Sequence, residues 1–299
     1  MDSYGVIGHR DRRADLRRAI VSGKVSHAYL FLGPTGVGKT TLARAFAKAL
    51  LCLEATGEAC GHCRSCSLFD SGNHPDLIPV GIDGESLKIE QIRELQRTLG
   101  FHPVLSRRKV VFLPYMEKMT EVAANGFLKT LEEPPAAVHF LGAAVDESVV
   151  LPTIRSRMQL VRLTYVPAEE IAQGLIQRGC PPEQAGTIAS GSQGLPGLAI
   201  RRFQEAEAAT RDWAALLEEA ELLPLLRKAA EAEKVPREQV GQWLDEMAAY
   251  YRGRLAVGGR ETAKKTLVIL EAIQTARNRL AFNVNARLLL EGVFLRICN

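Results

Sequence analysis

The chain has 299 residues and a formal net charge of +4, with 46% hydrophobic and 24% charged residues. These are the proportions of an ordinary soluble globular protein with room for two or three domains. The mild basic excess permits contact with nucleic acid without demanding it, and no apolar run reaches the ~20 residues of a membrane-spanning helix.

The first 165 residues alternate short apolar runs with helical patterns, which is typical of an α/β domain. The runs are nearly continuous in apolar character, as expected for a parallel sheet buried on both faces. Strands are predicted at 28–32, 77–80, 110–113, 138–143 and 159–163. Helices are predicted between them at 10–21, 40–51, 89–99 and 121–131.

Beyond residue 165 the strand patterns stop and only helical patterns follow. Segments 167–178 and 181–190 each open with proline, which suits the first turn of a helix. The glycine-rich joint GSQGLPG leads into a third helix at 198–207, so residues 166–207 are expected to form a small helical domain. From 208 to 299 the pattern is helical throughout, ending with helices at 262–277 and 285–297, where Asn285 can act as the N-cap.

The N-terminus, MDSYGVIGHRDRR, carries charges early and lacks the apolar region of a signal peptide. The six cysteines are not spaced like a disulfide framework, which fits a reducing compartment. We therefore expect a cytoplasmic protein with no membrane contact.

The segment GPTGVGKT matches the phosphate-binding pattern G-x-x-x-x-G-K-[ST] in full, between a predicted strand and a predicted helix. Backbone N–H groups of such a loop surround phosphate oxygens at the positive end of the helix. Lys39 would reach the β- and γ-phosphates, and the Thr40 hydroxyl would ligate Mg²⁺. The expected residues of an ATP or ADP site are Gly33, Pro34, Thr35, Gly36, Val37, Gly38, Lys39, Thr40 and Thr41. A glycine-rich turn with an empty pocket is the alternative.

Hydrolysis needs carboxylates that hold Mg²⁺ and position water. The third predicted strand ends instead in Pro114 and Tyr115. Glu117 could reach the site through a shift of register, but a solvated loop acid is the preferred interpretation. Ala143 and Ala144 stand where such ATPases usually place a polar residue. The sequence therefore predicts nucleotide binding without efficient turnover, and no independent catalysis.

Cys60, Cys63 and Cys66 form C-x2-C-x2-C, and Cys52 lies shortly upstream. Four thiolates on one short segment, at about 52–66, can fill all four coordination positions of a tetrahedral Zn²⁺ ion. Such a site leaves no position for a catalytic water, so the zinc would be structural. An iron–sulfur cluster is the second candidate, although the C-P ending of the bacterial ferredoxin run is absent. Free thiols are the third.

The segment PTIRSRM places Arg157 at the rim of the α/β domain. An arginine there can act as an arginine finger, neutralising charge on the γ-phosphate in a neighbouring subunit. From this segment alone, a solvated rim charge is favoured. Glu132 and Glu133, which precede two prolines, are interpreted as structural.

Basic side chains also lie on the helix at 89–99 and in the loop SRRK, where they could follow DNA phosphates without sequence specificity. They include Lys88, Arg93 and Arg97. Solvated helix charges remain the preferred interpretation of each one.

Several of these segments together resemble bacterial clamp-loader AAA+ subunits of DNA polymerase III. They are GPTGVGKT, the four cysteines, AANGFLKTLEEPP (123–135), TIRSR (153–157) and NVNARLLLEGVFLRI (283–297). Within the family the chain is most similar to the delta-prime group, which shares two losses with it. The motor subunits carry an Asp-Glu pair where this chain has Pro114 and Tyr115, and an arginine after the Gly-Ser of the lid, where this chain has GSQGLPG.

The resemblance implies an AAA+ nucleotide-binding domain (1–165), a three-helix lid (166–207) and an all-α collar domain (208–299). It implies a ring of five with tau/gamma motor and delta subunits, which acts indirectly on the sliding clamp. Within such a ring, the basic helices could contact primer-template DNA without sequence specificity. It also implies that Arg157 is a trans-acting arginine finger, although Met158 replaces the family's cysteine. The expected protein is a stator that binds ATP or ADP itself and triggers ATP hydrolysis in the neighbouring motor subunit. The alternatives are an active tau/gamma-like motor that uses Glu117, and a small-molecule P-loop kinase with a zinc knot.

Overall fold

A computed structural model describes residues 5–219, 221–255, 260–280 and 284–298. The chain divides into two compact units, the first ending at Ile200 and the second beginning at Arg201. Among the described residues, no helix is both long and apolar enough to cross a membrane.

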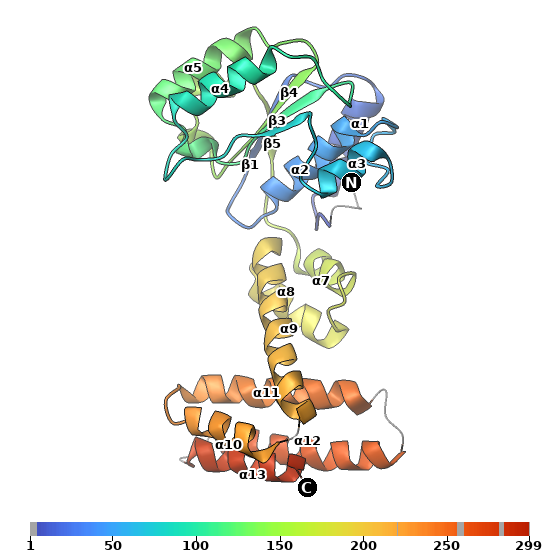
Figure 1. The fold of residues 1–299 in the computed structure, drawn as a ribbon, viewed down its shortest axis with the longest axis vertical. Helices are drawn as coiled ribbons and strands as arrows, with labels where there is room; N and C mark the ends of the chain where they lie inside the picture. Colours follow the sequence, from blue (N-terminus) through green and yellow to red (C-terminus); the bar gives the residue numbers. More distant parts are fainter. Residues whose placement is uncertain (1–4, 220, 256–259, 281–283, 299) are drawn as a thin grey trace. The chain divides into compact units, whose positions relative to one another are not determined.

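The first unit is built on a parallel sheet with the strand order β2-β3-β4-β1-β5 (Figure 1). The strands are β1 (Ala28–Leu32), β2 (Leu77–Pro79), β3 (Lys109–Leu113), β4 (Val138–Ala144) and β5 (Gln159–Arg162). Every residue of β1, β3 and β4 is buried. The parallel sheet buried on both faces, expected from the apolar runs, is confirmed.

Two apolar cores cover the two faces of this sheet, because successive side chains of a strand point to opposite faces. In β1, Tyr29 and Phe31 belong to the core under α1 (Arg10–Val21) and α2 (Lys39–Leu51). Leu30 belongs to the opposite core, with α4 (Ile89–Leu99) and α5 (Glu121–Glu132). The two helix layers lie on the two sides of the sheet in Figure 1.

The other helices of the first unit agree with the sequence predictions within a few residues, with two additions, at 64–70 and 152–155. They are α3 (Arg64–Asp70), α4 (Ile89–Leu99), α5 (Glu121–Glu132), α6 (Pro152–Arg155), α7 (Ala168–Ile176) and α8 (Pro182–Gly191). The helix α3 was not predicted, because its seven residues are too few to show helical periodicity among the cysteines. Short 3-10 turns lie at Met116–Lys118 (η2) and Glu147–Val149 (η3).

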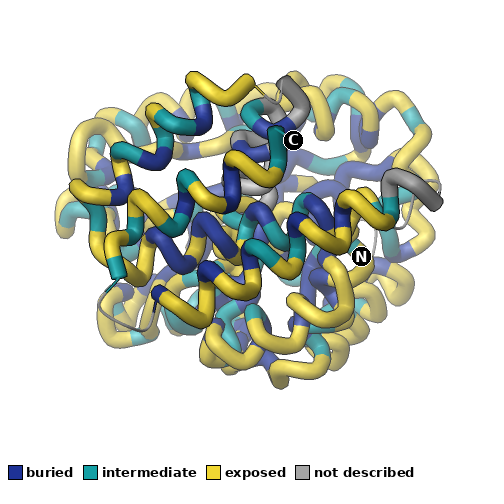
Figure 2. Tube along the Cα trace, turned by 90° about the horizontal axis from the view of Figure 1, so that it is seen from below, coloured by how far each residue is buried: buried dark blue, intermediate teal, exposed yellow. Residues whose placement is uncertain are grey.

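The helix α9 (Pro196–Glu219) begins in the first unit and continues past residue 207, where the lid was expected to end. The second unit adds α10 (Leu222–Glu231), α11 (Arg237–Leu255), α12 (Arg260–Leu280) and α13 (Ala286–Cys298). Its core includes Trp213, whose ring centroid lies 6.2 Å from that of Trp243, in an edge-on arrangement, and 6.2 Å from that of Phe294. Buried and exposed positions alternate along its helices, as Figure 2 shows. The division into nucleotide-binding, lid and collar domains stays a prediction.

The predicted N-cap of the last helix is confirmed. Asn285 Oδ1 accepts hydrogen bonds from the backbone N–H groups of Arg287 at 2.9 Å and Leu288 at 3.3 Å. Asn283, the first residue of the family-like tail, lies outside the described residues.

A buried polar network joins the C-terminal end of α2, the helix α3 and the loop before β3. The Asp76 carboxylate is fully buried and accepts hydrogen bonds from the backbone N–H groups of Val104, Leu105 and Ser106, at 2.6 to 2.8 Å. The adjacent His74 accepts from the Asp76 N–H, and its other ring nitrogen lies 2.8 Å from Ser65 Oγ. Burial lowers the pKa of His74, which keeps the ring neutral in this network.

Replacing Asp76 with alanine is expected to lower the free energy of unfolding by about 3 kcal/mol, because charge-assisted hydrogen bonds are lost and their donors are left behind. Urea denaturation followed by circular dichroism measures this change. The matched control is Asp83→Ala, which removes an exposed carboxylate paired with Lys88 at 2.8 Å and should have little effect. Equal stabilities for the two variants would contradict the assigned role of Asp76.

Candidate functional site

The phosphate-binding sequence forms the predicted loop between β1 and α2. Gly36 and Gly38 have φ angles of 83° and 106°, a left-handed conformation that favours glycine. Gly38 is the N-cap of α2, so the helix begins at Lys39 and directs its positive end toward the loop. The context required for a phosphate cradle is therefore present.

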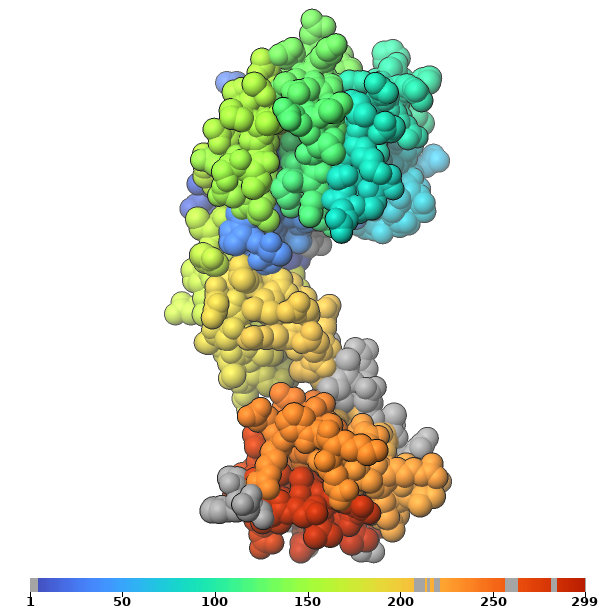
Figure 3. Space-filling model, turned by 90° about the vertical axis from the view of Figure 1, so that its left-hand side faces the viewer, coloured from blue at the N-terminus to red at the C-terminus, as the bar shows by residue number. Residues whose placement is uncertain are grey.

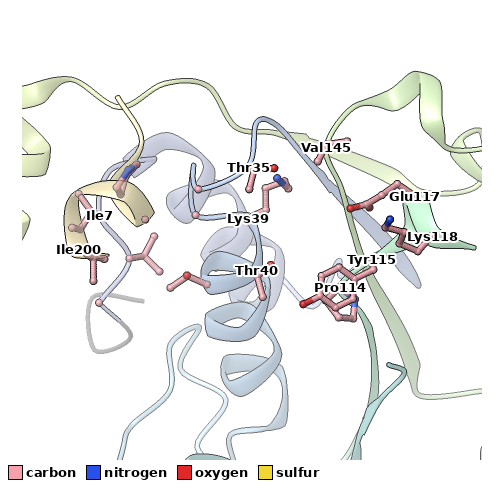
Figure 4. Close-up of a pocket in the computed structure, with 17 residues that line it drawn as sticks. Ile7, Thr35, Lys39, Thr40, Pro114, Tyr115, Glu117, Lys118, Val145 and Ile200 are labelled. Atoms are coloured by element: carbon pink, nitrogen blue, oxygen red, sulfur yellow. The ribbon is translucent and has the colours of Figure 1, made fainter. Parts of the chain in front are cut away.

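The side chains of the loop line a cavity of about 390 Å³, a size typical of small-ligand sites. Thr35, Thr40 and Thr41 are exposed to it from the loop and the first turn of α2. Its apolar lining includes Ile7 from the N-terminal segment and Ile200 from α9 (Figure 4). A polar end at the loop and an apolar end at the isoleucines fit a phosphate group joined to an aromatic base.

The helix α9 closes one side of this cavity against the loop. The backbone N–H of Gly197 donates a hydrogen bond to the Gly36 carbonyl at 2.8 Å. A Cβ at Gly197 would lie 3.0 Å from the same oxygen, so a larger residue would push the helix and the loop apart. The segment GSQGLPG is predicted to join two helices, and no pattern in the sequence indicates this contact with the loop.

Lys39 is held against the loop by two hydrogen bonds from its Nζ, to the carbonyls of Gly33 at 2.6 Å and Pro34 at 2.9 Å. Burial lowers the pKa of its ammonium group, while the nearby carboxylate of Glu117 acts in the opposite direction. An anionic phosphate in the cavity would favour the charged form of Lys39.

The end of β3 faces the same cavity. Pro114 and Tyr115 lie across it from Thr40, at the place where P-loop ATPases present acidic side chains (Figure 4). Neither side chain can supply a carboxylate. At the end of the neighbouring strand, Ala143 and Ala144 are buried and Val145 lines the cavity.

Glu117 is half-buried and lines the cavity, so its preferred interpretation as a fully solvated loop acid is wrong. The 3-10 turn η2 follows β3 after only Pro114 and Tyr115 and carries Glu117 back to the cavity, without any shift in strand register. Its Oε2 atom is buried and has no hydrogen-bond partner. In Figure 4 the Glu117 carboxylate points toward the side of the cavity where Lys39 lies. A one-turn 3-10 helix leaves no periodic signal, so sequence reasoning could not place this residue.

The four predicted cysteine ligands come together. The Sγ atoms of Cys52, Cys60, Cys63 and Cys66 all lie within 4.8 Å of one another, with separations of 4.0 Å (Cys52 to Cys63) and 3.9 Å (Cys60 to Cys66). Tetrahedral zinc with bonds of ~2.3 Å needs sulfur separations of about 3.8 Å. The donor set therefore fits a closed Cys₄ zinc site.

Backbone amides donate to three of these sulfurs and favour ionisation of Cys63, whereas burial raises the pKa of the Cys60 and Cys66 thiols. The N–H groups of Cys60, Cys63 and Cys66 donate to the sulfurs of Cys52, Cys60 and Cys63, each at 3.4 Å. Burial opposes ionisation of Cys63, but hydrogen bonds from the backbone of Cys66 and Leu53 outweigh it and lower the pKa of its thiol to about 6. Thiolates are the form that binds metal. His62 contacts Glu54 at 3.5 Å and lies within 4.8 Å of Cys60 Sγ, outside the four-sulfur set, and His74 belongs to the buried polar network.

Arg157 lies just after α6, with its guanidinium paired to Glu132 Oε1 at 2.7 Å and to the Thr153 carbonyl at 2.9 Å. Its side chain is 37% exposed. Glu132 ends α5, so the pair joins two segments that are distant in sequence. The neighbouring Met158 is buried in the core under α4 and α5, which gives a packing reason for methionine at this position.

The basic residues considered for DNA contact lie on α4 and at its N-terminal end. Lys88, Arg93 and Arg97 are exposed, and Lys88 pairs with Asp83. Figure 3 shows this side of the first unit, with α4 in teal and α5 in green.

Comparison with known proteins identifies relatives of this chain. The family described as DNA polymerase III, delta subunit, matches residues 8–167. The delta' subunit of DNA polymerase III from Bacillus subtilis is 37% identical over 175 residues, covering 58% of this chain and 53% of that protein. The Escherichia coli delta' subunit is 35% identical over 200 residues, covering 64% and 60%. The tau/gamma subunit from Haemophilus influenzae is 37% identical over 171 residues, covering 57% and 25%.

Solved structures support the fold. A variant of RuvB from Thermotoga maritima superposes with a TM-score of 0.51 at 17% identity, covering 71% of this chain and 65% of that one. This likeness and the parallel sheet give an AAA+ fold with a helical C-terminal region. The chain spans about 25 to 60% of the length of these curated relatives. Because the family match covers more than half of the residues, the chain belongs to the DNA polymerase III delta subunit family.

Proposed function

We propose that this protein is a delta-prime-like stator of a DNA polymerase III clamp loader, which binds ATP or ADP without hydrolysing it efficiently. The observation that carries the proposal is the edge of β3 opposite the phosphate loop. Pro114 and Tyr115 line the cavity there, whereas turnover needs carboxylates that hold Mg²⁺ and orient water. Nucleotide would serve as a structural ligand that joins the loop to α9 through Gly36 and Gly197.

The chain's own residues suggest how the nucleotide would be held. The N–H groups of the loop at Gly36 and Gly38 and the ammonium of Lys39 would bind the phosphates. The hydroxyl of Thr40 would ligate Mg²⁺, which when bound neutralises phosphate charge. Ile7 and Ile200 would cover the base. Zinc would be held by Cys52, Cys60, Cys63 and Cys66 and would stabilise the segment 52–66 that follows α2.

The partners follow from the family. The protein would join tau/gamma and delta subunits in a ring of five in the cytoplasm, aid loading of the sliding clamp, and present Arg157 to a neighbouring motor's nucleotide. The residues of α4 would then lie where they can contact primer-template DNA through phosphates. The boundaries 1–165, 166–207 and 208–299 are proposed for the nucleotide-binding, lid and collar domains.

The nucleotide site is tested on the isolated chain by calorimetric titration with ADP and by a steady-state ATPase assay. Wild type is expected to bind ADP and to show negligible turnover. Lys39→Ala should weaken binding about 10- to 100-fold, since hydrogen bonds to charged groups contribute ~1.5–3 kcal/mol. Lys24→Ala, at an exposed position, is the control and should bind as wild type does. Many turnovers per minute by the isolated wild type would refute the stator.

One observation favours a second candidate, an active tau/gamma-like motor. Glu117 is half-buried and lines the cavity, so a carboxylate would be available near the phosphates. An ATPase activity of the isolated chain that is lost in both Lys39→Ala and Glu117→Gln would support the motor over the stator.

A further inference from the structure

The guanidinium of Arg157 is held by side-chain and backbone groups of its own chain. Nη2 donates a hydrogen bond to Glu132 Oε1 at 2.7 Å. Nη1 donates to the Thr153 carbonyl at 2.9 Å and to Ser156 Oγ at 3.3 Å. Thr153 and Ser156 are close neighbours in sequence, whereas Glu132 lies 25 residues away, at the end of α5. The Glu132 contact is therefore the one that depends on the packing of two separate elements.

Both partners of this ion pair are fixed to the same apolar core. Leu131, which precedes Glu132 in α5, is buried in that core. Ile154 of α6 and Met158, on either side of Arg157, are buried in it as well. Two packed backbones thus present the carboxylate and the guanidinium to each other. The contact selects one arrangement from the many that a long arginine side chain can adopt.

The arrangement leaves part of the guanidinium available for another anion. The contacts to Glu132, Thr153 and Ser156 do not use all the N–H donors of a guanidinium. Among the described residues, Nε of Arg157 makes no hydrogen bond, and the side chain keeps 37% of its surface exposed. The remaining N–H groups suit phosphate oxygens, which arginine can bind through two parallel hydrogen bonds.

We propose that Glu132 is a positioning residue for Arg157, which holds the guanidinium ready for the γ-phosphate in a neighbouring motor subunit. The inference rests on the proposed function of Arg157 and extends it to a residue that touches neither nucleotide nor water. A cation speeds phosphate cleavage most when it is in place before charge develops, because no reorganisation is then needed during the reaction. The carboxylate of Glu132 provides that placement.

The position of the Glu132 oxygen is more important here than its charge. The Glu132 side chain is half exposed, so water screens its effect on the charge of Arg157. The hydrogen bond at 2.7 Å still fixes the direction of the guanidinium. Glu132→Gln keeps an acceptor oxygen and loses the charge, whereas Glu132→Ala loses both. The two variants therefore separate position from charge.

The test measures the DNA-stimulated ATPase of the loader assembled with tau/gamma and delta subunits, over a range of ATP concentrations. Glu132→Ala is expected to lower kcat about 10- to 100-fold, the effect of a misplaced catalytic group, with the KM for ATP unchanged. Glu132→Gln should keep most of the wild-type kcat. The matched control is Glu133→Ala, which removes the adjacent exposed carboxylate at the end of α5 and should match wild type.

A double-mutant cycle separates positioning from a general structural role. If Glu132 acts through Arg157, then Glu132→Ala should cause no further loss of kcat once Arg157 is alanine. A structural role would instead lower kcat by the same factor with and without Arg157. Because the pair is exposed, Glu132→Ala should leave thermal melting of the isolated chain and assembly by size-exclusion chromatography nearly unchanged.

The outcomes distinguish this assignment from the proposed finger. If Arg157→Ala hydrolyses ATP like wild type, the finger is refuted and the role of Glu132 is refuted with it. If Arg157→Ala is slow but Glu132→Ala matches or exceeds wild type, the finger stands and Glu132 does not position it. Equal losses in Glu132→Gln and Glu132→Ala, or with and without Arg157, would also overturn the assignment.

A further variant covers the case in which Glu132→Ala does not assemble. Glu132→Asp keeps the charge but withdraws the carboxylate by one methylene, so the contact with Arg157 should lengthen and kcat should fall. A wild-type kcat in an intact Glu132→Asp loader would overturn the assignment.

Discussion

Replacing Arg157 with alanine is expected to slow hydrolysis at the neighbouring motor's site about a thousandfold in an assembled loader, the lower range for an arginine finger. The physical reason is the loss of a planar cation that neutralises charge developing on the γ-phosphate. The guanidinium is available for this role because it is 37% exposed and its partner Glu132 is itself half exposed. DNA-stimulated ATPase of the complex with tau/gamma and delta subunits measures the effect.

Two further variants sharpen this result. Arg157→Lys keeps the charge but loses the forked geometry, and should recover only part of the rate. Arg155→Ala removes the adjacent arginine, which donates to the Glu147 carbonyl at 3.2 Å, and should leave the rate unchanged. Assembly, followed by size-exclusion chromatography, should be intact in all three. Wild-type turnover in an intact Arg157→Ala assembly would show that the finger lies elsewhere.

Replacing Cys66 with serine is expected to abolish stoichiometric zinc and to destabilise the first unit by about 3 kcal/mol or more, because metal binding free energy contributes directly to folding. Cys66 is buried on α3, where the preceding Ser65 donates to the Leu51 carbonyl at 2.7 Å. Loss of the metal would therefore loosen α3 and the buried polar network around His74 together. Metal analysis and thermal melting with and without a chelator measure both effects.

The control for the zinc site is Cys180→Ser, a buried cysteine of the same unit outside the cluster. It should retain one zinc per chain and melt in a chelator-sensitive manner, as wild type does. Iron with visible absorption in the purified protein would indicate a cluster instead. If the purified protein contains no metal and Cys66→Ser does not change its melting temperature, the four cysteines are free thiols.

The sequence by itself determined the features that depend on neighbouring residues. The strands of the sheet follow from apolar runs, the loop before Lys39 from its glycines, and the start of α13 from Asn285. The spacing of Cys60, Cys63 and Cys66 similarly indicated one compact metal site, because ligands a few residues apart cannot lie far from one another. These interactions are local, so a single stretch of sequence specifies them.

Only the tertiary structure decided which distant groups meet. Glu117 enters the nucleotide cavity because one 3-10 turn reverses its direction, and Arg157 finds Glu132 because α5 and α6 pack together. The pairing of Gly197 with Gly36 likewise joins segments far apart in the chain. Such contacts depend on the packing of whole elements, and a small change of direction in a short turn leaves no trace in hydrophobic periodicity.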